Sequence, residues 1–421
     1  MFRLAHSPKA RPLPRPLRAG RLRGRRVEPQ RAVYGRSFWF AYAANTALMM
    51  SVSLLFRYAD FVTLLGGGEL TLGLIVGIGM IGSFAARLAQ GVSIDRYGPR
   101  RVWLVSLAIV VSMLASHLVL TSVSSPAIYL VRIAYASGIA GAFGASITYV
   151  SLRAPAARMA EMIGVLGSSG FVGMAVGTQL GDALCGISTL QRWHLDRMFF
   201  VAAVLAALAF VCAWIATRGD VRPLARRRPP MLWLLRRYHP GPMLMMGLAM
   251  GMGLGLPSTF LRPYTESLGI ATIGTFFGIY AATAFSARIL LRRVPDRIGV
   301  RTTILLGMAA LVSSMLLYLA VRSPWTLVFP GVAVGLAHAM LFPAVMAGGS
   351  RTFPTRYRGL GTTLILGSFD LGNLIGMPLA GTIVDTASYV GLPPYPTMFL
   401  TFAGILLIAS ISYTTLSRES M

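Results

Sequence analysis

Polar side chains inside long apolar runs are the residues of this chain that could do chemistry. Asp370, Arg132 and His338 each lie within such a run, and Asn45 lies within another. Inserting a charged side chain at the centre of a bilayer costs about 3 kcal/mol, so charged residues there are usually functional. We therefore predict that these four residues belong to a solute or proton pathway.

Asp370 is the candidate for proton coupling. It lies about eleven residues into its apolar run, which places it about 17 Å from the helix end and near the middle of a membrane. Burial favours the protonated carboxyl over the carboxylate, so Asp370 could gain and lose a proton during a transport cycle. The alternative is a permanent structural bond to an arginine or to Asn373.

Arg132, His338 and Asn45 each have more than one interpretation. Arg132 could bind an anionic solute, keep Asp370 ionised, or extend to the outer membrane interface. His338 could relay protons because its side chain titrates near neutral pH, or it could simply pack. Asn45 could hydrogen-bond a solute or a neighbouring helix.

Arg262 and Glu266 lie one helical turn apart near the outer end of an apolar run. We predict an outer gate at this pair. The alternative is an interfacial ion pair worth less than about 1 kcal/mol.

Methionines gather in two of the runs. Because methionine adapts its shape, a cavity lined by them would suit varied apolar solutes and would favour an exporter of drug-like compounds. For most of them we prefer the alternative, in which the methionine faces lipid or packs against a neighbouring helix. These methionines are Met49, Met50, Met243, Met245, Met246, Met250 and Met252.

The elements that must position these residues are membrane-spanning helices. Of the 421 residues, 55% are hydrophobic and 12% are charged, against about 25% charged in soluble domains. A hydrocarbon layer of about 30 Å needs about 20 helical residues. Twelve apolar stretches of this length begin near residues 37, 70, 102, 126, 160, 197, 242, 269, 302, 324, 359 and 396. The predicted fold class is therefore an all-α membrane protein with twelve transmembrane helices.

The net charge of +26 has a topological explanation. Arginines gather in alternate loops, and the positive-inside rule then places both termini in the cytoplasm. We expect a multi-pass protein of the bacterial inner membrane, with the lipid bilayer and a small-molecule substrate as partners and no nucleic acid.

The chain divides into two halves that resemble each other. The predicted organisation is a basic tail at 1–36, a six-helix bundle at 37–217, a basic cytoplasmic linker at 218–241 and a second six-helix bundle at 242–417. Six identities recur at an offset of 201, which indicates pseudo-symmetric bundles. They pair Phe84, Arg87, Asp95, Arg96, Gly98 and Arg100 with Phe285, Arg288, Asp296, Arg297, Gly299 and Arg301.

The repeated stretch resembles a family motif. Residues 91–101 are similar to the loop between spans two and three of major facilitator transporters, and residues 292–301 are similar to its copy between spans eight and nine. The motif residues are Gly91, Asp95, Arg96, Gly98, Arg100 and Arg101, with Asp296, Arg297, Gly299 and Arg301 in the copy. Glycine permits a turn with positive φ, and a carboxylate can accept bonds from an arginine or a helix N-terminus. We predict a cytoplasmic gate here; ordinary turn and topology chemistry is the alternative.

The resemblance covers residues 37–417 and implies the major facilitator fold. It also implies that spans one, four, seven and ten line the cavity, which favours Asn45, and it links an arginine in span four, here Arg132, with proton or substrate handling. Residues 341–343, 358–363 and 369–372 resemble the same stretches of bacterial sugar or drug efflux permeases.

We expect a monomeric secondary active transporter that works by alternating access, with proton-coupled efflux as the leading hypothesis. The alternatives are proton-coupled uptake of a sugar or organic acid and, from another class, a non-transporting membrane sensor. The sequence has no phosphate-binding loop, no HExxH and no convincing nucleophile motif. We therefore expect no enzyme activity, no cofactor and no metal, with a proton gradient as the energy source.

Overall fold

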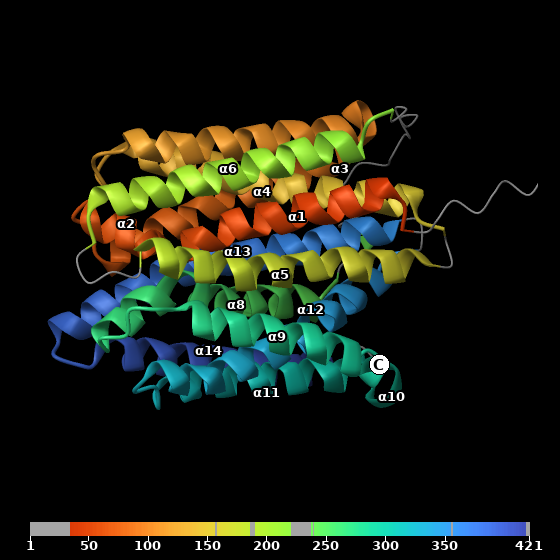
Figure 1. The fold of residues 1–421 in the computed structure, drawn as a ribbon. Helices are drawn as coiled ribbons and strands as arrows, with labels where there is room; N and C mark the ends of the chain where they lie inside the picture. The colour runs from red at the N-terminus through yellow and green to blue at the C-terminus, as the bar shows by residue number, and fades with distance from the viewer. Residues whose placement is uncertain are drawn as a thin grey trace, which may run out of the picture.

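The computed structural model describes residues 34–155, 158–185, 190–219, 237–238, 240–354 and 357–417. Regular structure in these ranges is helical (Figure 1). The predicted basic tail and most of the predicted linker lie outside the described residues. The N-terminal half contains α1 (Arg36–Leu54), α2 (Tyr58–Leu64), α3 (Glu69–Ser116), α4 (Pro126–Arg153), α5 (Met159–Cys185) and α6 (Arg192–Ala216), with 3₁₀ turns at Leu55–Arg57 and His117–Val119.

The C-terminal half repeats this pattern of long helices. It contains α8 (Pro242–Ser267), α9 (Gly274–Leu290), α10 (Val294–Ile298), α11 (Val300–Tyr318), α12 (Val328–Arg351), α13 (Arg358–Tyr389) and α14 (Pro394–Leu416), with a 3₁₀ turn at Pro324–Leu327.

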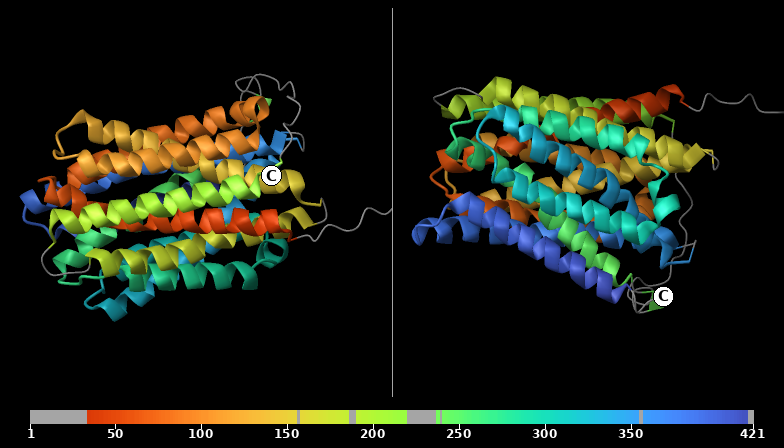
Figure 2. Two further views of the ribbon diagram at one scale, coloured as in Figure 1. Left: turned by 45° about the horizontal axis from the view of Figure 1, so that its top comes forward. Right: turned by 90° about the horizontal axis from the view of Figure 1, so that it is seen from below.

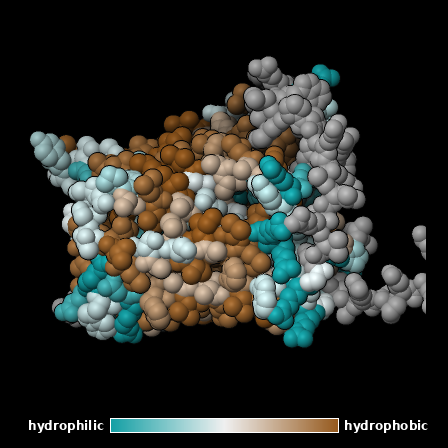
Figure 3. Space-filling view, turned by 90° about the horizontal axis from the view of Figure 1, so that it is seen from above, coloured by the Kyte–Doolittle hydropathy of each residue, from teal (hydrophilic) through white to brown (hydrophobic). Residues whose placement is uncertain are grey.

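Ten helical stretches among the described residues are long and apolar enough to cross a membrane. One of them, α3, contains two of the predicted spans, and α9 has only 17 residues. The count of twelve spans therefore stays a prediction. Apolar residues cover the middle of the face shown in Figure 3, and hydrophilic residues gather toward its two ends. Such a belt fits a hydrocarbon layer, and the all-α membrane fold is confirmed.

The internal repeat extends to the backbone at two glycines. Gly98 bends α3 with φ 81° and ψ 156°, and Gly299 separates α10 from α11 with φ 82° and ψ 156°. Residues with a side chain rarely adopt such a positive φ, so both turns require glycine. The positive φ predicted for Gly98 is confirmed.

The two halves pack along helices that come from different bundles. α3 lies against α13 and α5 lies against α9, whereas α1 packs on α5 and α6 within the first half and α8 packs on α13 within the second. Figure 2 shows the bundles from two further sides. α1 begins and α14 ends at one end of the molecule (Figure 1). We call it the arginine-rich end, because α4 and α12 also end there, at Arg153 and Arg351.

Glycines let α3 and α13 meet backbone to backbone near the opposite end. A Cβ atom on Gly73 would lie 2.3 Å from the carbonyl oxygen of Met377, and one on Gly381 would lie 2.4 Å from that of Glu69. Neither position has room for a side chain. Small residues of this kind allow close helix packing in membranes, and here they close the two halves against each other.

Candidate functional site

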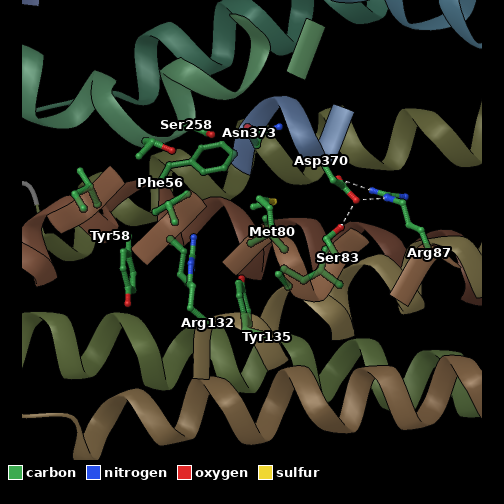
Figure 4. Close-up of a pocket in the computed structure, with 17 residues that line it drawn as sticks. Phe56, Tyr58, Met80, Ser83, Arg87, Arg132, Tyr135, Ser258, Asp370 and Asn373 are labelled. Atoms are coloured by element: carbon green, nitrogen blue, oxygen red, sulfur yellow. Dashed lines mark hydrogen bonds and ion pairs between the residues drawn. The ribbon is translucent and has the colours of Figure 1, made fainter. Parts of the chain in front are cut away.

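A cavity of about 210 Å³ lies between the two halves. Its walls come from α1, α2, α3 and α4 of the first half and from α8 and α13 of the second. The charged residues in its described lining are Arg87, Arg132 and Asp370 (Figure 4). The structure thus brings together two of the four residues predicted for the pathway, and adds Arg87.

Asp370 of α13 forms an ion pair with Arg87 of α3. The Nε atom of Arg87 lies 2.6 Å from Oδ2 of Asp370, and its Nη2 atom donates to Oδ1 at 3.3 Å. The Ser83 hydroxyl donates to the same Oδ2 at 2.7 Å. Asp370 is 2% exposed. A carboxylate this deeply buried needs such partners, because an unpaired buried charge is costly.

The helices place these side chains for simple geometric reasons. Ser83 and Arg87 are four residues apart, so they lie on one face of α3. Glycines on α13 bring that helix close to its neighbours; a Cβ atom on Gly372 would lie 2.1 Å from the carbonyl oxygen of Leu248 in α8. Because Arg87 belongs to α3 of the first half and Asp370 to α13 of the second, the ion pair joins the two halves.

Arg132 of α4 lies in another part of the same cavity, away from the Asp370 pair (Figure 4). Its Cζ atom lies 4.5 Å from the ring centroid of Tyr58 and 5.2 Å from that of Tyr135. The residue is 8% exposed, and its Nη1 atom has no hydrogen-bond partner among the described residues. Arg132 therefore neither extends to the membrane interface nor pairs with Asp370.

Gly79 makes room for the stem of Arg132. A Cβ atom on Gly79 would lie 2.6 Å from Cγ of Arg132. The absence of a side chain at this point of α3 thus lets the arginine enter the cavity from α4.

His338 and Asn45 do not belong to the described cavity lining. Nδ1 of His338 on α12 lies 2.6 Å from the Tyr280 hydroxyl on α9, and its ring packs near Phe171 of α5. Asn45 on α1 is 3% exposed, and its Oδ1 atom has no hydrogen-bond partner among the described residues. Asn373 of α13 supplies an amide to the cavity instead.

Four buried charges join the two halves at the end opposite to the arginine-rich end. Nε of Arg57 lies 2.8 Å from Oδ2 of Asp60, and its Nη1 lies 2.8 Å from Oδ1 of Asp182. Arg262 of α8 reaches across, with its Nε atom 2.8 Å from Oδ1 of Asp60. Each of these side chains is at most 9% exposed. We call these four residues the outer charge cluster.

Asp182 also holds the start of α9. The backbone N–H groups of Ile273 and Gly274 donate to its Oδ2 at 2.9 Å and 2.6 Å. A carboxylate is stabilised at a helix N-terminus by these free donors and by the helix dipole. The cluster therefore links α5 to both α8 and α9.

The predicted pair of Arg262 and Glu266 is present, but Arg262 has a closer partner that the sequence did not indicate. Glu266, the predicted partner, lies 3.5 Å away with a side chain that is 60% exposed, whereas Asp60 lies at 2.8 Å and is buried. Arg57, Asp60 and Asp182 were missed because their positions near helix ends are also those of ordinary interfacial charges.

The repeated loop motif lies at the arginine-rich end. Arg301, at the start of α11, donates through Nη2 to the carbonyl oxygen of Thr414 in α14 at 2.9 Å, a contact within the second half. Arg96 lies over the ring of its neighbour Tyr97. These contacts fit a loop fixed at a helix end, and the cytoplasmic gate stays a prediction.

Methionine lines the described cavity only at Met80 of α3. Met246, Met250 and Met252 of α8 are buried in the helix packing, with exposures of 0%, 0% and 5%. Packing, the preferred interpretation, therefore accounts for these three side chains, and they do not line this cavity.

Two helical bundles related by an internal repeat, with a cavity between them whose described lining includes apolar side chains and three charged residues, define the architecture of a secondary transporter. The family model of the Major Facilitator Superfamily matches residues 37–294 and 243–420. The chain belongs to this superfamily.

Curated relatives are distant but cover most of the chain. An uncharacterized MFS-type transporter of Pseudomonas aeruginosa is 27% identical over 76% of this chain and 79% of its own. The multidrug resistance protein MdtG of Salmonella arizonae is 23% identical over 65% and 68%. A putative tartrate transporter of Agrobacterium vitis is 24% identical over 85% and 84%.

Solved structures share the fold. The nucleoside transporter NupG superposes with a TM-score of 0.72 at 13% identity, covering 92% of this chain and 99% of its own. A D-xylose-proton symporter superposes with a TM-score of 0.73 at 14% identity, covering 91% and 98%. Family and fold together identify a multi-pass membrane transporter.

Proposed function

We propose that this protein is a proton-coupled secondary transporter in which Asp370 carries the proton. The ion pair with Arg87 supports this assignment, because its partners belong to different halves. A bond between halves must break when α3 and α13 separate during alternating access. Protonation of the carboxylate removes the charge that holds Arg87 and so makes that separation easier.

We also propose the orientation and the gates. The arginine-rich end faces the cytoplasm of a bacterial cell, as the positive-inside rule predicts. The outer charge cluster then closes the periplasmic side, and the repeated loop motif closes the cytoplasmic side in the opposite state. Four buried charges that pair with one another can close this end of the protein. When the halves separate, water reaches the four charges and stabilises them, so the end can also open.

Two directions of transport have support. Export is favoured by the similarity to the multidrug resistance protein MdtG. Proton-coupled uptake of an organic acid is favoured by the similarity to a putative tartrate transporter and by a cavity of about 210 Å³, which is smaller than the pockets of about 300–1,000 Å³ that hold drug-sized ligands.

Proteoliposomes with a pH-sensitive dye inside test the proposal. Drugs, sugars and organic acids are added in turn to wild type, to Asp370→Asn, and to Asp196→Asn as a matched control from a half-exposed surface ion pair. We expect solute-evoked proton flux in wild type and in Asp196→Asn and none in Asp370→Asn, with the sign of the flux separating antiport from symport. Solute movement without proton flux in wild type, or equal flux in Asp370→Asn, would overturn the proposal.

A further inference from the structure

Arg132 is a buried cation that forms no ion pair with the part of the chain that the structure describes. Its guanidinium lines the cavity at 8% exposure, and its Nη1 atom has no hydrogen-bond partner among the described residues. No described carboxylate forms an ion pair with it. A buried guanidinium needs a counter-charge or hydrogen-bond acceptors, because removing it from water is costly. The described residues supply neither to Nη1, so a solute that carries an acceptor group can serve as its partner.

The other charges of the cavity do not supply that partner. Asp370, the carboxylate in the described lining, is already bound by Arg87 and Ser83. Two guanidinium groups against one carboxylate leave the described lining with one excess positive charge, and that charge is located at Arg132. An uncharged solute would leave it uncompensated.

The surroundings of Arg132 hold the guanidinium without using its donors. Tyr58 and Tyr135 contact it through cation–π interactions, which stabilise a cation but occupy none of its five N–H donors. A planar guanidinium with free N–H groups matches a carboxylate or a phosphate, which accept two parallel hydrogen bonds. The carboxylate is the better fit to a cavity of about 210 Å³ whose other walls include Phe56, Val76 and Ile139.

We infer that the transported solute is a small organic anion whose carboxylate binds Arg132. The hydroxyl groups of Ser258 and Thr259 and the amide of Asn373 line the same cavity from the second half and can hydrogen-bond the remainder of the solute. The inference deepens the proposed transport function and rests on it, because it names the class of solute for the same cavity.

Equilibrium binding to the purified protein in lipid nanodiscs tests the inference without requiring transport. The probes are lactate, succinate and gluconate, measured by calorimetry against the uncharged lactamide, succinamide and sorbitol. We expect at least one carboxylate to bind wild type and to bind Arg132→Gln about tenfold more weakly or worse, as loss of a charge-assisted hydrogen bond implies. Arg132→Lys should restore part of the affinity. Arg218→Gln, which removes an exposed arginine that stacks on Trp214 outside the cavity, should not change the affinity.

A second variant guards against misfolding of Arg132→Gln. Ala136 lies four residues after Arg132 on α4 and lines the cavity, so Ala136→Glu supplies an internal carboxylate on the same helix face. Ala136→Glu should weaken anion binding as strongly as Arg132→Gln does, whereas the similarly sized Ala136→Gln should weaken it less.

Three results would overturn the inference: no carboxylate of the panel binds wild type, the uncharged probes bind equally well, or Arg132→Gln and Ala136→Glu bind the anion unchanged. Failure of the proposed function has a different signature. Anion binding that depends on Arg132, in a protein without solute-evoked proton flux, would remove proton coupling and keep the anion site. Proton flux evoked only by uncharged solutes would keep proton coupling and remove the anion site.

Discussion

Asp370 and Arg87 form an ion pair between the two halves of the transporter, although 283 positions separate them in the chain. Asp370 is buried and Arg87 is partly buried, with side-chain exposures of 3% and 17%, and the pair lies in the wall of the cavity. Under the proposed mechanism, a proton bound to Asp370 changes both the contact between the halves and the wall of the cavity.

Removal of Arg87 alone should destabilise the protein more than removal of both Arg87 and Asp370. Arg87→Gln leaves a buried carboxylate without its cation, which costs about 3–5 kcal/mol in such pairs. The double variant Arg87→Gln with Asp370→Asn has no charge left to compensate and should unfold at a higher temperature than Arg87→Gln. Thermal unfolding in detergent measures the difference. A double variant that unfolds at or below the temperature of Arg87→Gln would show that the pair is not coupled.

The outer charge cluster should control access from the periplasm. Arg262→Gln removes the cation that crosses from α8 to Asp60, so the closed outer end should open more often. A cysteine at Ser258, in a background with Cys185 and Cys212 replaced by serine, reports this opening through its reaction with a membrane-impermeant maleimide added outside cells.

We expect faster labelling of Ser258→Cys in Arg262→Gln than in the parent protein. Asp196→Asn is the matched control, because it breaks a half-exposed ion pair with Arg192 within one half, and exposed pairs contribute at most about 1 kcal/mol. Equal labelling rates in Arg262→Gln and the control would exclude the cluster as the outer gate.

The glycine contact between α3 and α13 should be needed for closure of the outer end. In Gly73→Ala the new Cβ atom would lie 2.3 Å from the carbonyl oxygen of Met377, so the two helices have to move apart. We expect slower transport and faster labelling at Ser258→Cys. Gly404→Ala places its Cβ atom in open space on α14 and should leave both unchanged. Normal transport in Gly73→Ala would mean that this contact is not part of the cycle.

Gly299→Ala should destabilise the protein through backbone strain alone, because the added methyl group meets no neighbouring atom. No atom lies within 4 Å of the added Cβ, but φ at this residue is +82°. We expect a loss of about 1–3 kcal/mol of stability from the positive-φ backbone alone, seen as a lower unfolding temperature in detergent. Gly164→Ala, also in open space but in helical α5, is the control. If both variants unfold at the same temperature, the turn does not depend on glycine.

The sequence predicted what depends on local pattern. Apolar runs long enough to span a bilayer gave the helices, and the repeat with its glycines at 98 and 299 gave the two halves and their turns. Asp370 stood out because a carboxylate within an apolar run is costly. Each of these signals can be seen without knowing which helices touch.

What the sequence could not predict depends on how the halves meet. Arg87 carried a signal, its place in the repeat, but nothing local assigns it to Asp370 in the other half. Arg262 has Glu266 one turn away, and only the packing of α8 against α2 shows that Asp60 is the closer partner. His338 looked suited to a proton pathway, yet the structure places it beside Tyr280 and outside the cavity lining.

The most direct test of the account compares two modes of transport in Asp370→Asn proteoliposomes. One assay follows exchange of a labelled transported solute across the membrane without a proton gradient, and the other follows its movement against a concentration gradient when a proton gradient is imposed. An asparagine mimics the protonated carboxyl, so we predict that exchange persists and that proton-driven movement is lost. Proton-driven movement at the wild-type level in Asp370→Asn would contradict the assignment of Asp370 as the residue that carries the proton.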